Sequence, residues 1–290
     1  MRAEDYLQGD VARFCQWLSQ RLGGDPIHFA VPGHDKQFLT LHEALQAYAW
    51  PLKKLAGLPN PDPVYPYRHP EVPTLLAKGS LAANTAVLRL IQQALRAAYY
   101  AGPASPEALA GAVAATFHWG GVYKETPFGG NKPWLAGNYH GLFAILENVV
   151  NDHARGDDES QVRDLRFNAG MTKVYSLLID DFVIYDSRVA ASLAWLVLNW
   201  WTQVEGKPSD QLHEHLRFLC LPGNGNASKW RNPQPQLFKT RATAPYEHYK
   251  WNVRLNWLLR GAQQRAGERS RFNSLREIEA ALFQMGERVV

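Results

Sequence analysis

Apolar residues recur every three to four positions along most of the chain, which is the spacing of amphipathic α-helices. No segment alternates apolar and polar residues for long enough to indicate a half-buried strand. The pattern therefore predicts an all-α fold. The predicted helices cover residues 4–22, 39–55, 74–100 with a break at Gly79-Ser80, 105–117, 139–150, 172–179, 187–201, 211–219, 245–261 and 273–287.

Two stretches interrupt this helical pattern. Residues 59–73 are rich in proline, which fixes φ and lacks an amide donor, so a semi-rigid loop is expected there. Residues 151–160 are rich in charge, which predicts a break between helices at the surface and a possible subdomain boundary. We therefore divide the chain into 1–150, an N-terminal helical subdomain with proline- and glycine-rich loops, and 151–290, which ends in basic helices.

Composition indicates an ordinary globular protein, because 46% of the 290 residues are apolar and the net charge is only +4. Cys15 and Cys220 are too few for a disulfide framework, which favours a reducing compartment. The acidic N-terminal residues do not form an export signal. The longest apolar stretch, 189–201, is shorter than the ~20 residues of a spanning helix. A cytoplasmic protein without a membrane partner is expected.

The charge is unevenly distributed along the chain. Residues 229–271 contain ten Lys or Arg against two Glu, a balance of +8, so the rest of the chain carries 4 minus 8, or −4. Aromatic residues alternate with these cations, a combination that suits single-stranded or extruded nucleotides. The segment is interpreted as a nucleic-acid face, with a solvated basic face as the alternative, and its candidate contacts are Lys229, Arg231 and Asn232.

The segment 167–189, FNAGMTKVYSLLIDDFVIYDSRV, carries the candidate chemistry. Asp186 directly precedes a predicted helix, where free amides and the helix dipole favour an ionised carboxylate. Lys173 lies at the start of another helix, where the same dipole disfavours an ammonium. A neutral amine can attack C1′ of a sugar and form a Schiff base, while a carboxylate stabilises the oxocarbenium charge.

This segment resembles the helix-hairpin-helix DNA glycosylases, and most specifically bacterial proteins of the 8-oxoguanine DNA glycosylase fold. Residues 118–122, HWGGV, and 230–233, WRNP, are also similar to segments of that subgroup. The resemblance implies two helical subdomains with a pocket between them and a helix-hairpin-helix core within 151–290.

The resemblance also implies a set of roles. Lys173 would be the nucleophile and Asp186 the catalytic carboxylate in excision of a flipped, modified purine such as 8-oxoguanine, with or without a lyase reaction. That chemistry requires no cofactor or metal. The implied contacts to DNA or the base, including the candidates already named in the basic segment, are Gly170, Met171, Thr172, Arg188, Trp119, Gly120, Lys229, Arg231 and Asn232.

Several alternatives stay open at this stage. The turn before Lys173 has one glycine, Gly170, where glycosylase hairpins usually read Gly-x-Gly, and only 13 residues separate Lys173 from Asp186. Lys173 could be a solvated helix residue, Asp186 an N-cap and Trp119 a core residue. Members of the subgroup resemble proteins of phage-defence gene clusters, so the fold could bind nucleic acid, a modified nucleobase or a protein partner in antiviral defence, or act as an interaction scaffold.

Overall fold

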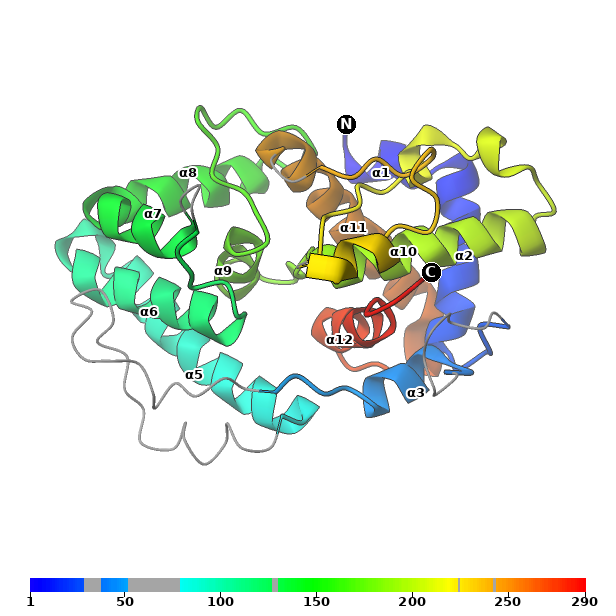
Figure 1. Cartoon of the computed structure of the whole chain (residues 1–290), viewed down its shortest axis with the longest axis horizontal. Coiled ribbons are helices and arrows are strands. Elements are labelled where there is room, and N and C mark those ends of the chain that lie inside the picture. Colours follow the sequence, from blue (N-terminus) through cyan, green and yellow to red (C-terminus); the bar gives the residue numbers. More distant parts are fainter. Residues whose placement is uncertain (29–37, 52–78, 127–129, 224, 242–243) are drawn as a thin grey trace. The chain divides into compact units, whose positions relative to one another are not determined.

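The computed structural model describes residues 1–28, 38–51, 79–126, 130–223, 225–241 and 244–290. Within these ranges most residues are helical and no strand is present, which confirms the all-α prediction (Figure 1). The predicted proline-rich loop at 59–73 lies outside the described residues. The helices are α1 (Ala3–Tyr6), α2 (Gly9–Leu22), α3 (Leu41–Gln46), α5 (Leu81–Tyr100), α6 (Pro106–Trp119), α7 (Asn131–Asn138), α8 (Leu142–Ala154), α9 (Met171–Leu178), α10 (Ser187–Asn199), α11 (Pro245–Ala266) and α12 (Leu275–Met285).

Backbone contacts divide the chain into two compact units. Unit 1 contains residues 1–48, 156–160 and 183–290, and unit 2 contains residues 49–155 and 161–182. Each unit therefore includes segments from both sides of residue 150, where the sequence analysis divided the chain. The boundary at 182–183 separates Lys173, in unit 2, from Asp186, in unit 1.

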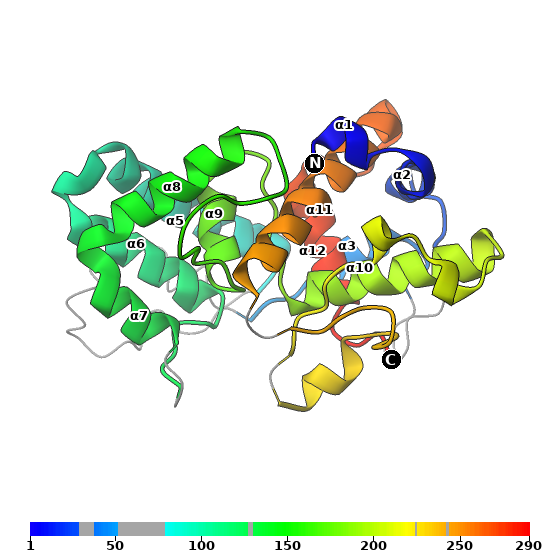
Figure 2. The ribbon, with the colours of Figure 1, turned by 90° about the horizontal axis from the view of Figure 1, so that it is seen from above.

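In unit 1, helices from the N-terminal part of the chain pack against helices from its C-terminal part. The long helix α11 lies against α2, and α12 lies against α3 and α10 (Figure 2). Cys15 on α2 is buried, as its apolar helical face predicts, and Cys220 is buried as well. Gly261 lets α11 approach α2 closely, because a Cβ at this position would lie 3.2 Å from the Sγ of Cys15.

Unit 2 is built from helices α5 to α9. Helix α5 begins at Ser80, whose Oγ accepts a hydrogen bond from the amide of Ala83, and α6 lies beside α5 (Figure 1). Most of α6 is buried, including Phe117 and Trp119 near its end. Helix α9 packs against α5, α6 and α8, so the helix that carries Lys173 is embedded in this unit.

Four predicted elements differ from the structure. The helix predicted over 39–55 ends at Gln46, and residues 48–51 are not helical. The helix predicted over 4–22 is interrupted after Tyr6 and resumes at Gly9, whose φ is +54°. The segment 211–219 forms only short 3₁₀ turns, and at its end the carbonyl of Leu219 accepts from the hydroxyl of Tyr185 at 2.6 Å. Helix α11 continues through Gly261 to Ala266, so that glycine serves helix packing and does not end the helix.

The helix-hairpin-helix fold stays a prediction. Helix α8 ends at Ala154 and α9 begins at Met171, with no helix between them, so the turn before α9 is preceded by an irregular segment.

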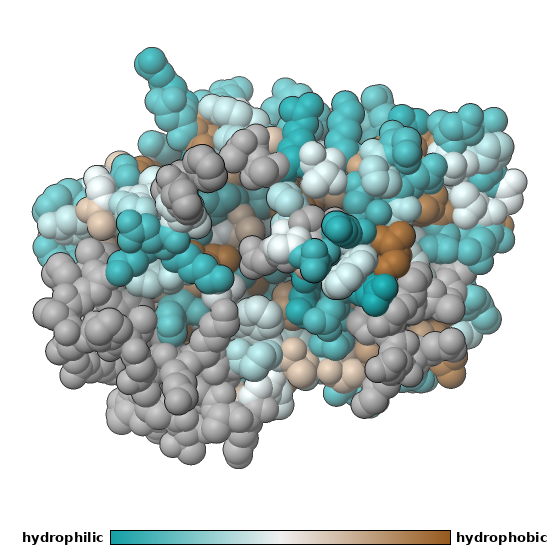
Figure 3. Space-filling view, in the orientation of Figure 1, coloured by the Kyte–Doolittle hydropathy of each residue, from teal (hydrophilic) through white to brown (hydrophobic). Residues whose placement is uncertain are grey.

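Hydrophilic residues cover most of the described part of the face seen in Figure 3, and hydrophobic residues occur there in small patches. None of the helices in the described part of the chain is long and apolar enough to cross a membrane.

Candidate functional site

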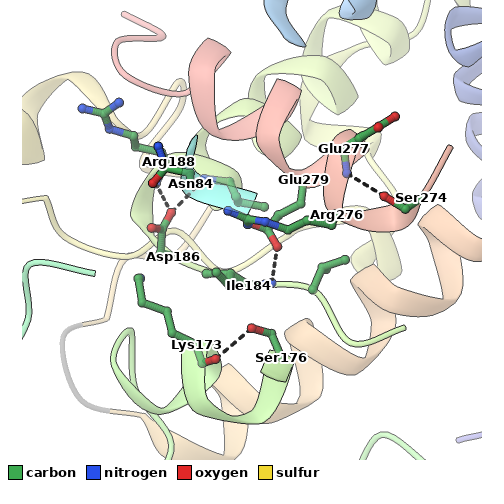
Figure 4. Close-up of polar contacts among 12 residues, drawn as sticks. Asn84, Lys173, Ser176, Ile184, Asp186, Arg188, Ser274, Arg276, Glu277 and Glu279 are labelled. Carbon is green, nitrogen blue, oxygen red and sulfur yellow. Dashed lines mark hydrogen bonds and ion pairs between the residues drawn. The ribbon is translucent and has the colours of Figure 1, made fainter. Parts of the chain in front are cut away.

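Lys173 lies in the first turn of α9 and is only 5% exposed. Its Nζ donates a hydrogen bond to the carbonyl of Ala169 at 2.9 Å, and its own carbonyl accepts from Ser176 Oγ (Figure 4). A lysine that is almost fully buried is uncommon and needs a hydrogen-bonding partner. The interpretation of Lys173 as a solvated helix residue is therefore wrong.

Gly120 and Lys173 are brought together in unit 2. A Cβ on Gly120 would lie 2.5 Å from Cδ and 2.7 Å from Cε of Lys173, so the absence of a side chain at position 120 provides the space for the lysine stem. The neighbouring Trp119 is buried, and its indole Nε1 donates to Asn84 Oδ1 at 2.9 Å. Trp119 thus has the contacts of a core residue, the alternative role that the sequence left open.

The turn before α9 is organised by Asn168. Its Oδ1 accepts hydrogen bonds from the amides of Gly170 and Met171 at 2.8 and 2.9 Å, an Asx-type arrangement. Its Nδ2 donates to Oδ1 of Asn131, at the start of α7. The side chain of Asn131 approaches Gly170 so closely that a Cβ on residue 170 would lie 2.4 Å from Nδ2 of Asn131. The single glycine of this turn is thus explained by the close approach of α7. Met171 and Thr172, the other predicted contacts on the turn, are fully buried.

Asp186 is the N-cap of α10, as its position in the sequence predicts. Its Oδ1 accepts from the amides of Arg188 and Val189 at 3.0 and 3.3 Å (Figure 4). These bonds satisfy amides that have no partner within the helix, and the helix dipole favours the negative charge.

The extended segment that leads to Asp186 is held by side chains of α11. Asn256 Oδ1 accepts from the amide of Val183 at 2.7 Å, and Asn252 Nδ2 donates to the Val183 carbonyl at 2.9 Å. His248 Nε2 lies 2.6 Å from the carbonyl of Tyr185. These three buried side chains are four residues apart, so they form one polar stripe along α11, which we call the α11 ladder.

An ion pair on α12, between the buried Glu279 and the partly exposed Arg276, completes the support of this segment. Glu279 Oε2 accepts from the amide of Ile184 at 2.9 Å, and its Oε1 pairs with Arg276 (Figure 4). Burial lowers the pKa of Arg276, whereas Tyr48 and Asp186 nearby oppose that shift. Burial likewise raises the pKa of the Tyr48 hydroxyl. Asp186 therefore has a partly exposed guanidinium and a buried phenol from unit 1 in its surroundings.

The predicted contacts of the basic segment have different surroundings. Arg231 donates to Ser187 Oγ at 2.7 Å, beside the Asp186 cap. Asn232 is buried, and its Nδ2 donates to the carbonyl of Phe238 and to Thr240 Oγ1, so it organises its own loop. Lys229 is exposed. Arg254, counted in the same basic segment, is buried against Asp158 at 2.6 Å and is unavailable to a ligand.

The structure thus gathers the predicted residues into two groups. Unit 2 contains Trp119, Gly120, Gly170, Met171, Thr172 and Lys173, and unit 1 contains Asp186, Arg188, Lys229, Arg231 and Asn232. Sequence reasoning missed the supporting residues Asn252, Asn256, Arg276 and Glu279. The one available signal was the polar stripe at 248, 252 and 256 on an otherwise apolar helix face.

Among the residues that the structure describes, no cluster of His, Cys, Asp or Glu is arranged to hold a metal ion. Comparison of the chain with protein-family models, with curated proteins and with solved structures found no match.

Proposed function

We propose that this protein is a DNA glycosylase that excises a modified purine, such as 8-oxoguanine, by base flipping and attack on C1′. The burial of Lys173 at the start of α9, in the space left by Gly120, carries the proposal. Removal from water disfavours an ammonium, and the neutral amine is the form that attacks carbon. A lysine kept for solubility would have no reason to occupy such a position.

In the proposed reaction the Lys173 nitrogen forms a bond to C1′ while the glycosidic bond breaks. The electron pair of that bond leaves with the base, which takes up a proton as the amine loses one. Positive charge accumulates on the sugar, and Asp186 is the carboxylate that would stabilise it. Its fixed position as the cap of α10 supports this role, because the carboxylate would need no reorganisation during the reaction.

Borohydride trapping tests the nucleophile. The protein is incubated with duplexes that contain 8-oxoguanine, a deazaguanine or an abasic site, and borohydride reduces any Schiff base to a stable adduct. We expect an adduct with the wild type and with Lys207→Gln, a change to a partly exposed lysine that pairs with Asp10 and Glu205, and none with Lys173→Gln. A base-release assay on the same duplexes detects a glycosylase that uses water. The absence of both an adduct and base release on every duplex would contradict the proposal.

A second candidate is a protein that binds nucleic acid or a modified nucleobase without cleavage. The turn before α9 favours it, because the amides of Gly170 and Met171 already donate to Asn168, whereas a glycosylase hairpin would direct such amides at a phosphate. This candidate predicts that the wild type and the double variant Lys173→Gln/Asp186→Asn bind the same duplexes equally well, with no base released by either.

A further inference from the structure

Two arginines of unit 1 converge on one acidic residue. Nη2 of Arg188 lies 3.1 Å from Oε1 of Glu287, and Nε of Arg231 lies 3.5 Å from the Glu287 carbonyl oxygen. Burial lowers the pKa of the Arg231 guanidinium, and the nearby charge of Arg188 lowers it further, while Asp186 and Glu287 oppose both effects. The two guanidinium groups are therefore close enough to act on one anion.

Both arginines are fixed by contacts other than Glu287. The Arg188 guanidinium lies over the ring of Phe283, 4.5 Å from its centroid, and only 16% of the side chain is exposed. Nη1 of Arg231 donates to Ser187 Oγ at 2.7 Å. A guanidinium held in this way has lost most of its rotamer freedom before a ligand arrives, which favours binding.

Glu287, in contrast, is held mainly through its backbone. Gly286 lies so close to α10 that a Cβ there would overlap the Arg188 carbonyl, and the amide of Val289 donates to the carbonyl of Trp230 at 2.8 Å. The Glu287 side chain itself is 53% exposed. An ion pair with such an exposed partner contributes little to stability, so the carboxylate can leave Arg188 while the Glu287 backbone stays in place.

We propose that Arg188 and Arg231 form a binding site for a phosphodiester of the DNA backbone, and that the Glu287 carboxylate, paired with Arg188, blocks this site until DNA displaces it. This inference rests on the proposed function, since it assigns a phosphate contact to the same protein. Carboxylate and phosphate present similar oxygens to a guanidinium, and arginine binds both through paired N–H donors. Glu287 therefore acts as an internal competitor that lowers affinity for DNA.

Substitution of Glu287 by glutamine tests the competition. Fluorescence anisotropy measures binding of a short labelled duplex with an abasic-site analogue, at a series of potassium chloride concentrations. The matched control is Glu268→Gln, which makes the same change in net charge at an exposed position of unit 1. We expect Glu287→Gln to bind about fivefold more tightly than Glu268→Gln at low salt, the effect of one removed charge near ~4 Å in water. Arg188→Gln and Arg231→Gln should each weaken binding and reduce the salt slope by about one.

The outcomes separate this inference from the proposed function. If Glu287→Gln binds DNA no more tightly than Glu268→Gln, Glu287 is not a competitor and the inference is wrong. If neither the wild type nor Glu287→Gln binds DNA, the proposed function is contradicted, and titration with inorganic phosphate then decides the inference. Tighter phosphate binding by Glu287→Gln than by Glu268→Gln would support an oxyanion site at Arg188 and Arg231. Equal binding by the two variants would contradict it. Circular dichroism of each variant checks that the fold is kept.

Discussion

At the scale of single residues, several glycines of this chain are explained by close approach and not by a turn. Gly120 makes room for the stem of Lys173, Gly170 for the side chain of Asn131, and Gly261 for α2. From the sequence, Gly261 reads as a helix end because glycine is common just after the last turn. A close neighbour cannot be seen in the sequence, since it comes from a segment far away in the chain.

The contact at Gly170 leads to a stability prediction. We expect Gly170→Ala to destabilise the protein by about 1–3 kcal/mol, because the new Cβ would push Asn131 away from its hydrogen bonds with Asn168 and Arg166. Urea unfolding of the variant provides the measurement. The matched control is Gly137→Ala in α7, where a Cβ would meet nothing within 4 Å. This control should be neutral or more stable by up to about 1 kcal/mol, because alanine favours helix. Equal effects of the two changes would contradict the packing argument.

At the scale of elements, the prediction was most accurate where a local signal marks a boundary. Asp186 was expected to begin a helix and does, and Ser80 caps α5 next to the expected break. The segment 211–219 was predicted as a helix from its leucine spacing but forms only short 3₁₀ turns. At its end the carbonyl of Leu219 accepts from the hydroxyl of Tyr185, and the amide of Cys220, which directly follows the segment, donates to the carbonyl of Lys239. Local spacing carries no information about such distant partners.

The α11 ladder gives a prediction at this scale. Asn256→Ala would leave the buried amide of Val183 without its acceptor, and we expect a loss of about 1–3 kcal/mol in the free energy of unfolding. Gln264→Ala, at an exposed position of the same helix, is the control and should change stability by less than about 0.5 kcal/mol. Hydrogen exchange at the Val183 amide adds a local readout, because exchange there should accelerate in the Asn256 variant alone. Unchanged protection of that amide would show that the ladder does not hold the connector.

At the scale of the whole chain, the candidate site was only partly predictable. The spacing in 167–189 identified Lys173 and Asp186, and both occupy the starts of helices. Their supports come from α7, α11 and α12, which lie up to about a hundred residues away in the sequence, as Glu279 and Ile184 illustrate with a separation of 95 residues. The net charge of the basic segment also overstated the number of cations that a ligand could contact, because Arg254 forms a buried ion pair with Asp158.

That ion pair joins three distant parts of the sequence in unit 1. The fully buried Asp158 accepts from the amino group of Met1 at 2.9 Å and from Arg254 in α11 at 2.6 Å. Burial alone would raise the pKa of Asp158, but these two hydrogen bonds and charges outweigh it and hold the pKa below its ordinary value of 3.8. Asp158 therefore stays ionised in the folded protein at pH values where the same carboxyl is already protonated in the unfolded chain.

The sign of the pH dependence follows from this depressed pKa. The stabilisation by Asp158 is complete above the pKa of the unfolded chain and is lost as the pH falls through the lower pKa of the folded state. Asp158→Asn should therefore be destabilised by on the order of 3 kcal/mol at neutral pH, since it leaves Arg254 buried without its counter-charge. The difference in the free energy of unfolding between wild type and variant should then narrow as the pH falls from about 4 to about 2, because the wild-type carboxylate becomes neutral too.

Urea unfolding at a series of pH values measures this difference. The control is Asp210→Asn, at an exposed position of unit 1, which shows the general effect of removing a carboxylate. A difference that stays constant down to the lowest pH would mean that Asp158 stabilises the fold by its shape and not by its charge.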